Sequence, residues 1–284
     1  MPATQVESQA PWARAIDSLA SAEVLIDALL TRCVIDVRGQ LFRPAEVELY
    51  LNNAVHPDPF THGLPEQERA GHWYLHRSGP GGGFKGGSFK GIDLACGQPG
   101  GPAGVLIRSL ERANGPSAGA LITGPSLCVD ALLAATGCAS AAELHAALGD
   151  LCVSALDCPV QLATRENLPA RRPFRTARVG LTLKDRNELE QRMRFVLRRY
   201  RWLTAPRAIK KGRLLLLLSL LADGWERADI AALTGSPPSA IDRAATGLAH
   251  GRALPLTDFV GKHLDSATLA SMYGSFLAQE ARRE

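Results

Sequence analysis

The chain has 284 residues and a mass of 30.3 kDa, enough for one large domain or about two ordinary ones. With 46% hydrophobic and 21% charged residues, its composition is that of a globular protein and excludes an intrinsically disordered one. The longest nearly pure apolar run is Leu214–Ala222, whereas a membrane helix needs about 20 such residues. The first residues include Glu7 and Asp17 and no apolar stretch, so we expect neither a membrane span nor a signal peptide.

The six cysteines form no C-x-x-C pair, and the histidines at 56, 62, 72 and 76 fit no common zinc spacing. Cysteines in apolar contexts, such as Cys33 and Cys128, are typical of buried free thiols. We therefore expect a reducing, cytoplasmic setting and no metal.

Charge is unevenly distributed along the chain. The net charge of +4 divides into −6 for residues 1–169 and +10 for residues 170–284, and Arg171–Arg213 alone holds 15 basic and 3 acidic residues. A block this basic is suited to neutralising a polyanion such as DNA or RNA. The alternative is a solvated face that keeps the protein soluble.

The N-terminal half predicts a helix followed by strands. Apolar residues recur at helical spacing in Ala13–Thr31, and polar and apolar residues alternate through Arg38–Leu51. Trp73–Gly104 contains eleven glycines, which favour hairpins and turns, and Val105–Leu110 predicts a further strand.

The second half predicts two helices, two strands and then a helical segment. Ser126 and Ser140 are the expected N-caps of the two helices. The expected elements are helices at Ser126–Ala135 and Ser140–Leu148, strands at Val179–Leu183 and Arg194–Leu197, and helices from Lys211 onward with breaks at Gly224, Gly235 and Gly251. We place the domain boundary near Ala205–Gly212, giving domains of residues 1–204 and 205–284.

Glu48 is the strongest candidate for chemistry. It lies within an apolar strand, one alternation from Tyr50, and Arg108 lies on another strand of similar character. A carboxylate in a partly desolvated sheet can take a proton from water, and a nearby guanidinium would keep it ionised. The alternative is a purely structural Glu–Arg pair or a solvent-facing glutamate.

Several short motifs around these residues follow one another in a characteristic order. They are Glu46-Val47-Glu48-Leu49-Tyr50, His62 after Asp58-Pro59-Phe60-Thr61, Leu106-Ile107-Arg108-Ser109-Leu110-Glu111, Gly124-Pro125-Ser126 with Ala131-Leu132, and Arg178-Val179-Gly180 followed by Arg194-Phe195-Val196 and Trp202-Leu203. Together they resemble the alkyladenine (3-methyladenine) DNA glycosylase family over roughly residues 18–204.

The resemblance implies a monofunctional N-glycosylase that flips a damaged purine out of the duplex and hydrolyses its bond to deoxyribose. Glu48 would be the general base, Arg108 would position water and the adjacent phosphate, and the Leu203 carbonyl would also hold the water. Tyr50 would stack on one face of the base, and His62 would pack against the other. No cofactor is implied. Without the resemblance, the favoured interpretation is that Tyr50 is a core aromatic residue and His62 a loop histidine with satisfied hydrogen bonds.

The sequence departs from the family pattern between His62 and Arg108. The family inserts a tyrosine into the duplex from a hairpin here, whereas this chain has the glycine-rich segment 81–91. Phe84 or Phe89 could serve as the wedge and Lys85 and Lys90 could contact phosphates, or the segment is an ordinary flexible loop.

A second departure is Asp93, which stands where the family has an asparagine thought to disfavour guanine. A carboxylate accepts hydrogen bonds from different base donors, so we expect Asp93 to contact the base and alter substrate preference.

Residues 205–284 lie outside the resemblance. Ala228–Arg252 resembles a helix-turn-helix, with Ser236 as the expected cap of a second helix that has Pro237 in its first turn. The exposed face of that helix would offer Arg243 as its only basic side chain, so base reading is doubtful. Lys210, Lys211 and Arg213 are better phosphate candidates, and a small helical bundle without DNA contact is the alternative.

These observations predict an α+β protein with a curved, mainly antiparallel sheet, flanking helices and a small all-α C-terminal domain. The expected function is hydrolytic removal of modified purines from duplex or single-stranded DNA by a monomer without a membrane partner. The alternatives are a non-catalytic nucleic-acid-binding protein and an N-glycosidase that acts on RNA, a nucleoside or a nucleotide.

Overall fold

The computed structural model describes residues 10–181 and 189–282. The chain forms two compact units, and it passes between them more than once. The first unit contains residues up to Pro173 together with Trp202–Thr204, and the second contains Phe174–Arg201 and Ala205–Glu284. The boundary expected after residue 204 is therefore one of the points at which the chain crosses between the units. Residues 174–201 belong with the C-terminal helices in the second unit.

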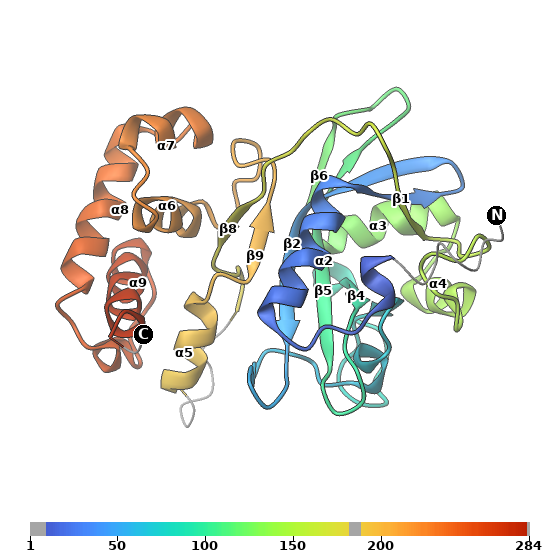
Figure 1. The fold of residues 1–284 in the computed structure, drawn as a ribbon, viewed down its shortest axis with the longest axis horizontal. Coiled ribbons are helices and arrows are strands. Elements are labelled where there is room, and N and C mark those ends of the chain that lie inside the picture. The colour runs from blue at the N-terminus through green and yellow to red at the C-terminus, as the bar shows by residue number, and fades with distance from the viewer. Residues whose placement is uncertain (1–9, 182–188, 283–284) are drawn as a thin grey trace. The chain divides into compact units, whose positions relative to one another are not determined.

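The first unit is built on a curled antiparallel sheet, drawn in blue to green in Figure 1. Its main strand order is β3-β4-β5-β2-β1-β7, with β6 paired to β5 and β9 paired to β2. The strands are β1 (Cys33–Val37), β2 (Gln40–Leu51), β3 (His72–Leu75), β4 (Ile92–Ala95), β5 (Ala103–Arg112), β6 (Leu121–Thr123), β7 (Gln161–Thr164) and β9 (Arg201–Leu203). The antiparallel sheet expected from the alternating segments is confirmed.

Strand β1 was not predicted, and its hairpin with β2 has a clear local cause. The connecting residues Arg38 and Gly39 have φ values of 52° and 83°. Two successive left-handed residues form the two-residue turn that matches the twist of antiparallel strands. The chain can therefore reverse directly after Val37, and β1 pairs with the start of β2.

The pairing of β2 with β5 contains two compensating irregularities near its centre. The register passes from Pro44–Leu110 to Glu46–Ser109, which skips Ala45 on β2, and then to Val47–Ile107, which skips Arg108 on β5. Such bulges redirect side chains and free backbone groups. The Ala45 carbonyl accepts a hydrogen bond from the Thr204 amide, at 2.9 Å.

Three α-helices flank the sheet, and their caps only partly match expectation. Helix α2 (Leu19–Thr31) packs on β2, and α3 (Pro125–Thr136) packs on β5 (Figure 1). Helix α4 (Ala141–Leu148) is capped by Ser140 as predicted, since its hydroxyl accepts the Glu143 amide. The predicted cap Ser126 is wrong, because Gly124 holds that position and the Ser126 hydroxyl instead donates to the Gly87 carbonyl.

Four short 3₁₀ helices complete the architecture, three in the first unit and one in the second, among the residues that the structure describes. They are η1 (Pro11–Ala13), η2 (Pro65–Glu68), η3 (Gly87–Phe89) and η4 (Leu256–Phe259).

The second unit begins with strand β8 (Phe174–Thr176) and continues with helices. The predicted strand at Arg194–Leu197 is wrong, since these residues end helix α5 (Leu189–Leu197). The three-residue apolar run Phe195–Leu197 fits either element, and its residues are buried together with Met193 on a helix. Of the predicted strand Val179–Leu183, residues 179–181 are irregular and the rest lie outside the described part.

The remaining helices are α6 (Arg213–Ala222), α7 (Arg227–Thr234), α8 (Pro238–Gly251) and α9 (Ser266–Glu280). Helices α7 and α8 are joined by a short turn at Gly235, whose φ of +66° is left-handed and ends α7. This confirms the helix-turn-helix-like pair. The predicted cap Ser236 is wrong, because Pro237 is the N-cap and Ser236 is buried.

Helices α8 and α9 pack closely through glycine. A side chain at Gly251 would overlap the backbone carbonyl of Ser271, and one at Gly274 would overlap the carbonyl of Leu248. Small residues thus let the two backbones approach, and overpacking at such a contact costs typically 1 to 3 kcal/mol.

Within the described residues, no single helix has the length and apolar character needed to span a membrane. Helices α3 and α4 have that length and apolar character only as a pair, and the pair is bent by 63°. All six cysteines are free, and Cys33, Cys96, Cys128 and Cys158 are buried.

Gly251→Ala is expected to lower the free energy of unfolding by about 1 to 3 kcal/mol, because the new methyl group meets backbone that cannot rotate away. Urea unfolding followed by circular dichroism measures the change. Gly83→Ala is the control, since a methyl group there meets nothing within 4 Å. Equal stability of the two variants would contradict the close packing of α8 on α9.

Candidate functional site

One face of the sheet carries a row of polar residues across four strands. Glu48 on β2 lies opposite Leu106 on β5, Leu106 lies opposite Asp93 on β4, and Asp93 lies opposite Tyr74 on β3. Directly opposed residues of antiparallel strands point to the same face. Tyr50 lies two residues along β2 from Glu48, so it shares this face.

At the β2 end of the row lies what we term the carboxylate cluster, which consists of Glu46, Glu48, Tyr50, Arg108 and Ser109. Glu48 is 0% exposed. Its Oε2 accepts hydrogen bonds from the Tyr50 hydroxyl at 2.9 Å and from Arg108 Nη1 at 3.1 Å. The structure thus brings together three residues that the sequence singled out.

Glu46 is the second carboxylate of this cluster. Its Oε1 accepts from Arg108 Nε at 3.2 Å, and its Oε2 accepts from the Ser109 hydroxyl at 2.5 Å. Both donors reach one carboxylate because the bulge sets Arg108 and Ser109 together opposite Glu46. Arg108 therefore bridges two buried carboxylates.

The charge state of Arg108 follows from this arrangement. Burial by itself lowers the pKa of the guanidinium, but Glu48 and then Glu46 outweigh burial, so the pKa lies above its ordinary value.

From helix α3, the buried Cys128 lies near Glu46. Burial first, and then the Glu46 charge, raise the pKa of the Cys128 thiol, which stays protonated.

At the β3–β4 end lies what we term the histidine cluster, made of His62, Gln67, Tyr74, His76, Lys85 and Asp93. His76 Nε2 lies 2.7 Å from Asp93 Oδ1, and the rings of His62 and His76 meet edge to face with centroids 4.5 Å apart. His62 Nδ1 lies 2.8 Å from the Tyr74 hydroxyl. Residues from two strands, the η2 helix and two loops thus form one connected group.

Asp93 is buried, and both of its oxygens have partners. Oδ1 contacts His76, and Oδ2 accepts from Gln67 Nε2 at 3.3 Å. Asp93, which was expected to contact the base, thus has internal partners, and its carboxylate orients the partly exposed His76.

Two glycines make room for this pair. A side chain on Gly104 would lie 2.7 Å from Asp93 Oδ2, and one on Gly91 would lie 2.5 Å from the His76 ring. The His76 ring consequently rests on bare backbone, which fixes its orientation.

Lys85 determines the proton position on His62. The Lys85 ammonium lies 3.3 Å from His62 Nε2 and can only donate, so Nε2 accepts, and Nδ1 carries the proton that is donated to Tyr74. The pKa of His62 is lowered to about 4, first because neighbouring groups exclude water from the ring and then because of His76 and Lys85. The Asp93 carboxylate acts in the opposite direction but is outweighed. His62 is therefore neutral at pH 7.

The two clusters are separated by an uncharged strip of β5. Glu48 and Asp93 lie two strands apart, which corresponds to roughly 10 Å. Leu106 and Gly104 occupy the strand between them. The face thus carries a buried carboxylate held by a guanidinium at one end and a group of hydrogen-bonded rings at the other.

The glycine-rich segment places its four candidate residues differently from one another. Phe84 packs internally, with the Arg77 guanidinium 4.0 Å from its ring centre and the His145 ring at 5.0 Å. Lys90 forms an ion pair with Asp130 of helix α3. Phe89 is 76% exposed, which makes it the better placed of the two candidate wedges.

Leu203, whose carbonyl was expected to hold water, is buried in β9 beside the Thr204 amide that binds Ala45.

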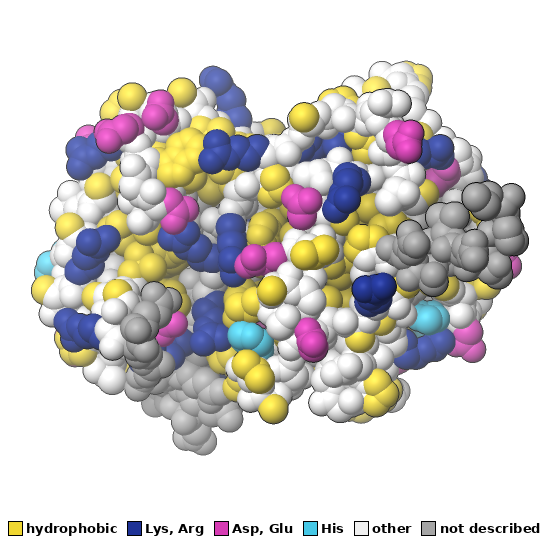
Figure 2. Space-filling view, viewed as in Figure 1, with side chains coloured by type: hydrophobic (Ala, Val, Ile, Leu, Met, Phe, Trp, Pro, Cys, Tyr) yellow, Lys and Arg dark blue, Asp and Glu magenta, His cyan; other side chains and the backbone are white. Residues whose placement is uncertain are grey.

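Internal contacts occupy much of the basic block 171–213. Arg178 and Arg201 are each 1% exposed, and their guanidinium groups donate to the carbonyls of Phe195 and Lys211. Arg199 contacts Asp223 at 2.5 Å and the Tyr273 hydroxyl at 3.0 Å. Sequence charge therefore overstates the cationic surface, and on the face viewed in Figure 2 Lys and Arg side chains lie in separate groups with acidic side chains among them.

The C-terminal candidates divide in the same way. Lys210, Lys211 and Arg243 are exposed, whereas Arg213 donates to the carbonyls of Thr234, Arg207 and Ile209.

Sequence reasoning missed Glu46, Tyr74 and His76 as site residues. Glu46 lies two residues before Glu48, so the alternation of the strand already placed both carboxylates on the same face. Tyr74 and His76 also alternate, but the glycines that follow masked the strand. Among the described residues, no group of His, Cys, Asp and Glu could hold a metal ion.

Comparison with known proteins adds little to this geometry. No family model and no solved structure matches the chain. Uncharacterized protein L759 of Acanthamoeba polyphaga mimivirus is 35% identical over 122 residues, which cover 38% of this chain and 55% of that protein. The chain thus spans about half the length of this relative, whose name assigns no activity.

His62→Gln is expected to make the protein more resistant to acid. The pKa of His62 is lower in the folded state than in the unfolded state, so the unfolded chain binds the extra proton as pH falls from about 6.5 towards 4. The native histidine thus costs stability in this interval and none at pH 8. Urea unfolding at pH 8, 6 and 4.5 measures this, and a variant that loses as much stability as the native protein between pH 8 and 4.5 would contradict the assignment.

Proposed function

We propose that this protein is a monofunctional DNA N-glycosylase that removes modified purine bases by hydrolysis. The observation that carries the proposal is the buried Glu48 carboxylate, held on the strand face by Tyr50 and Arg108. This arrangement supports the role of general base that the resemblance to the alkyladenine DNA glycosylases implies for Glu48.

In the proposed reaction, Glu48 takes a proton from a water molecule as the water oxygen attacks the anomeric carbon of the nucleotide. The bond between that carbon and the base nitrogen breaks, and its electron pair leaves with the base. Arg108 holds the carboxylate in place, since its Nη1 lies 3.1 Å from Glu48 Oε2. A base that carries a positive charge leaves with little help from an acid.

The histidine cluster provides the contacts that would read the extruded base. Both ring nitrogens of His62 are engaged, by Tyr74 and Lys85, so His62 would pack against the base through its ring face. His76 is held by Asp93 through Nε2 and is the partly exposed ring that would lie near the purine edge. Tyr50 is half-buried and offers ring surface for stacking, while its hydroxyl is engaged by Glu48.

Phe89 is the proposed wedge that fills the space left by the base. It lies in η3, and a large apolar side chain at an exposed turn suits insertion between base pairs.

Glu48→Gln is expected to lower the rate of base release at least about 100-fold while DNA binding persists, because the amide cannot accept a proton from water. Oligonucleotides containing 3-methyladenine, 7-methylguanine, hypoxanthine or ethenoadenine are incubated with the protein and treated with alkali to reveal abasic sites. Glu111→Gln is the control, since Glu111 lies on the same strand as Arg108 but pairs with Arg171. Unchanged release by Glu48→Gln would refute the general base.

The same assay separates the alternatives. Binding of DNA by the native protein without release of any of the four bases favours a non-catalytic nucleic-acid-binding protein. Release from RNA or free nucleotides, but not from DNA, favours the other N-glycosidase.

Phe89→Ala is expected to slow release from duplex DNA on the order of tenfold and to leave release from single strands nearly unchanged, because only the duplex must be held open. Leu156→Ala is the matched control, since Leu156 is 87% exposed in the same unit. Parallel time courses on both substrates measure the ratio, and an equal loss on duplex and single strand would count against the wedge.

A further inference from the structure

A cationic cavity lies at the turn between α7 and α8 in the second unit. It has a volume of about 390 Å³ and is lined by Arg207, Lys210, Arg213 and the turn residues Thr234–Pro237. None of these lining residues, all within the described part of the chain, is acidic.

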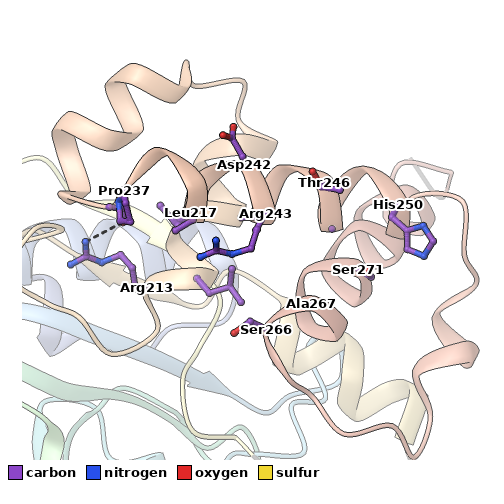
Figure 3. Close-up of a pocket in the computed structure, with 15 residues that line it drawn as sticks. Arg213, Leu217, Pro237, Asp242, Arg243, Thr246, His250, Ser266, Ala267 and Ser271 are labelled. Atoms are coloured by element: carbon purple, nitrogen blue, oxygen red, sulfur yellow. Dashed lines mark hydrogen bonds between the residues drawn. The ribbon is translucent and has the colours of Figure 1, made fainter.

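Arg213 forms the base of this cavity without a carboxylate among its described partners. Its guanidinium donates to three backbone carbonyls and lies 3.4 Å from the Ser236 hydroxyl (Figure 3). Nε has no hydrogen-bond partner among the described residues. Burial lowers the pKa of Arg213, as expected for a positive charge that lacks a negative neighbour.

Arg207 and Lys210 form the exposed rim. The Arg207 side chain lies along Gly235, where a methyl group would sit 3.4 Å from Nε. The Arg207 side chain thus lies against the left-handed turn, and Lys210 follows three residues further along the chain and lines the same cavity. Three positive charges converge on one concave surface.

A larger cavity of about 780 Å³ adjoins the first and shares Arg213, Ser236 and Pro237 with it. It follows α8, and Figure 3 shows Arg243 extending from α8 back toward Arg213. Asp242 also lines it but forms an ion pair with Arg227 at 2.9 Å. The positive charge thus continues along the first turns of α8.

We propose that this cavity binds a backbone phosphate of nucleic acid, with Arg207 and Lys210 as the contacting cations and Arg213 as a fixed positive base. The ligand is the phosphodiester rather than a base edge, because every converging donor is a cation or a hydroxyl and α8 exposes a single basic side chain. The second unit then anchors the substrate strand independently of its sequence.

The test is binding of a fluorescein-labelled, undamaged 20-base-pair duplex, followed by anisotropy from 50 to 300 mM NaCl. The double variant Arg207→Gln and Lys210→Gln is expected to bind about tenfold more weakly at 100 mM NaCl. The slope of log K against log salt should become shallower by about 2, because two phosphate contacts are lost. Both side chains are exposed, so the fold is retained, and the melting temperature checks this.

Lys262→Gln is the control, since Lys262 is an exposed lysine of the same unit that lies against Phe259 and outside the cavity. An unchanged slope in the double variant would overturn the proposal. A second outcome would also overturn it: the native protein and the double variant bind the duplex equally, but inorganic phosphate stabilises only the native protein. The cavity would then bind a free anion rather than the nucleic-acid backbone. Because undamaged DNA is used, failure here leaves the role of Glu48 untouched, and failure of the Glu48 test leaves this site untouched.

Discussion

The central interaction of the sheet is the bridge from Arg108 to Glu46 and Glu48. Removing an ion from water costs several kcal/mol, and a buried carboxylate is tolerated only with close, hydrogen-bonded partners. Arg108 donates to both carboxylates, from Nε to Glu46 and from Nη1 to Glu48, because the bulge on β5 sets it opposite Glu46 rather than in the regular alternation. The register of β2 and β5 is therefore fixed by charge as well as by packing.

This register also decides where the rest of the polar face lies. Once Glu48 is opposite Leu106, the pairing of β5 with β4 and of β4 with β3 sets Asp93 and Tyr74 in the same row. Gly104 leaves the volume that the Asp93 carboxylate occupies, and Gly91 does the same for His76. Two polar clusters about 10 Å apart, with an uncharged strip between them, are the consequence.

The second unit shows how misleading net charge can be. Arginines at 178, 199 and 201 are used to satisfy carbonyls and an acidic or phenolic partner, so they contribute to folding rather than to a cationic surface. The charge available to a ligand is concentrated instead at a turn, where Arg207 and Lys210 surround a guanidinium that has no carboxylate among its described partners. The phosphate site proposed at this turn therefore involves fewer side chains than the charge of the block 171–213 would predict.

From the sequence alone, the alternation around Glu48 and Arg108 determined two strands and the face that each residue occupies, because side-chain direction in a strand has a period of two. Helical spacing and Ser140 likewise determined local helices. Only the tertiary structure decided that Glu46 binds Arg108, that the Asp93 carboxylate contacts His76, and that the Arg213 guanidinium donates to backbone carbonyls. Those outcomes depend on the bulged register and on which residues distant in the chain meet, and no local pattern encodes either.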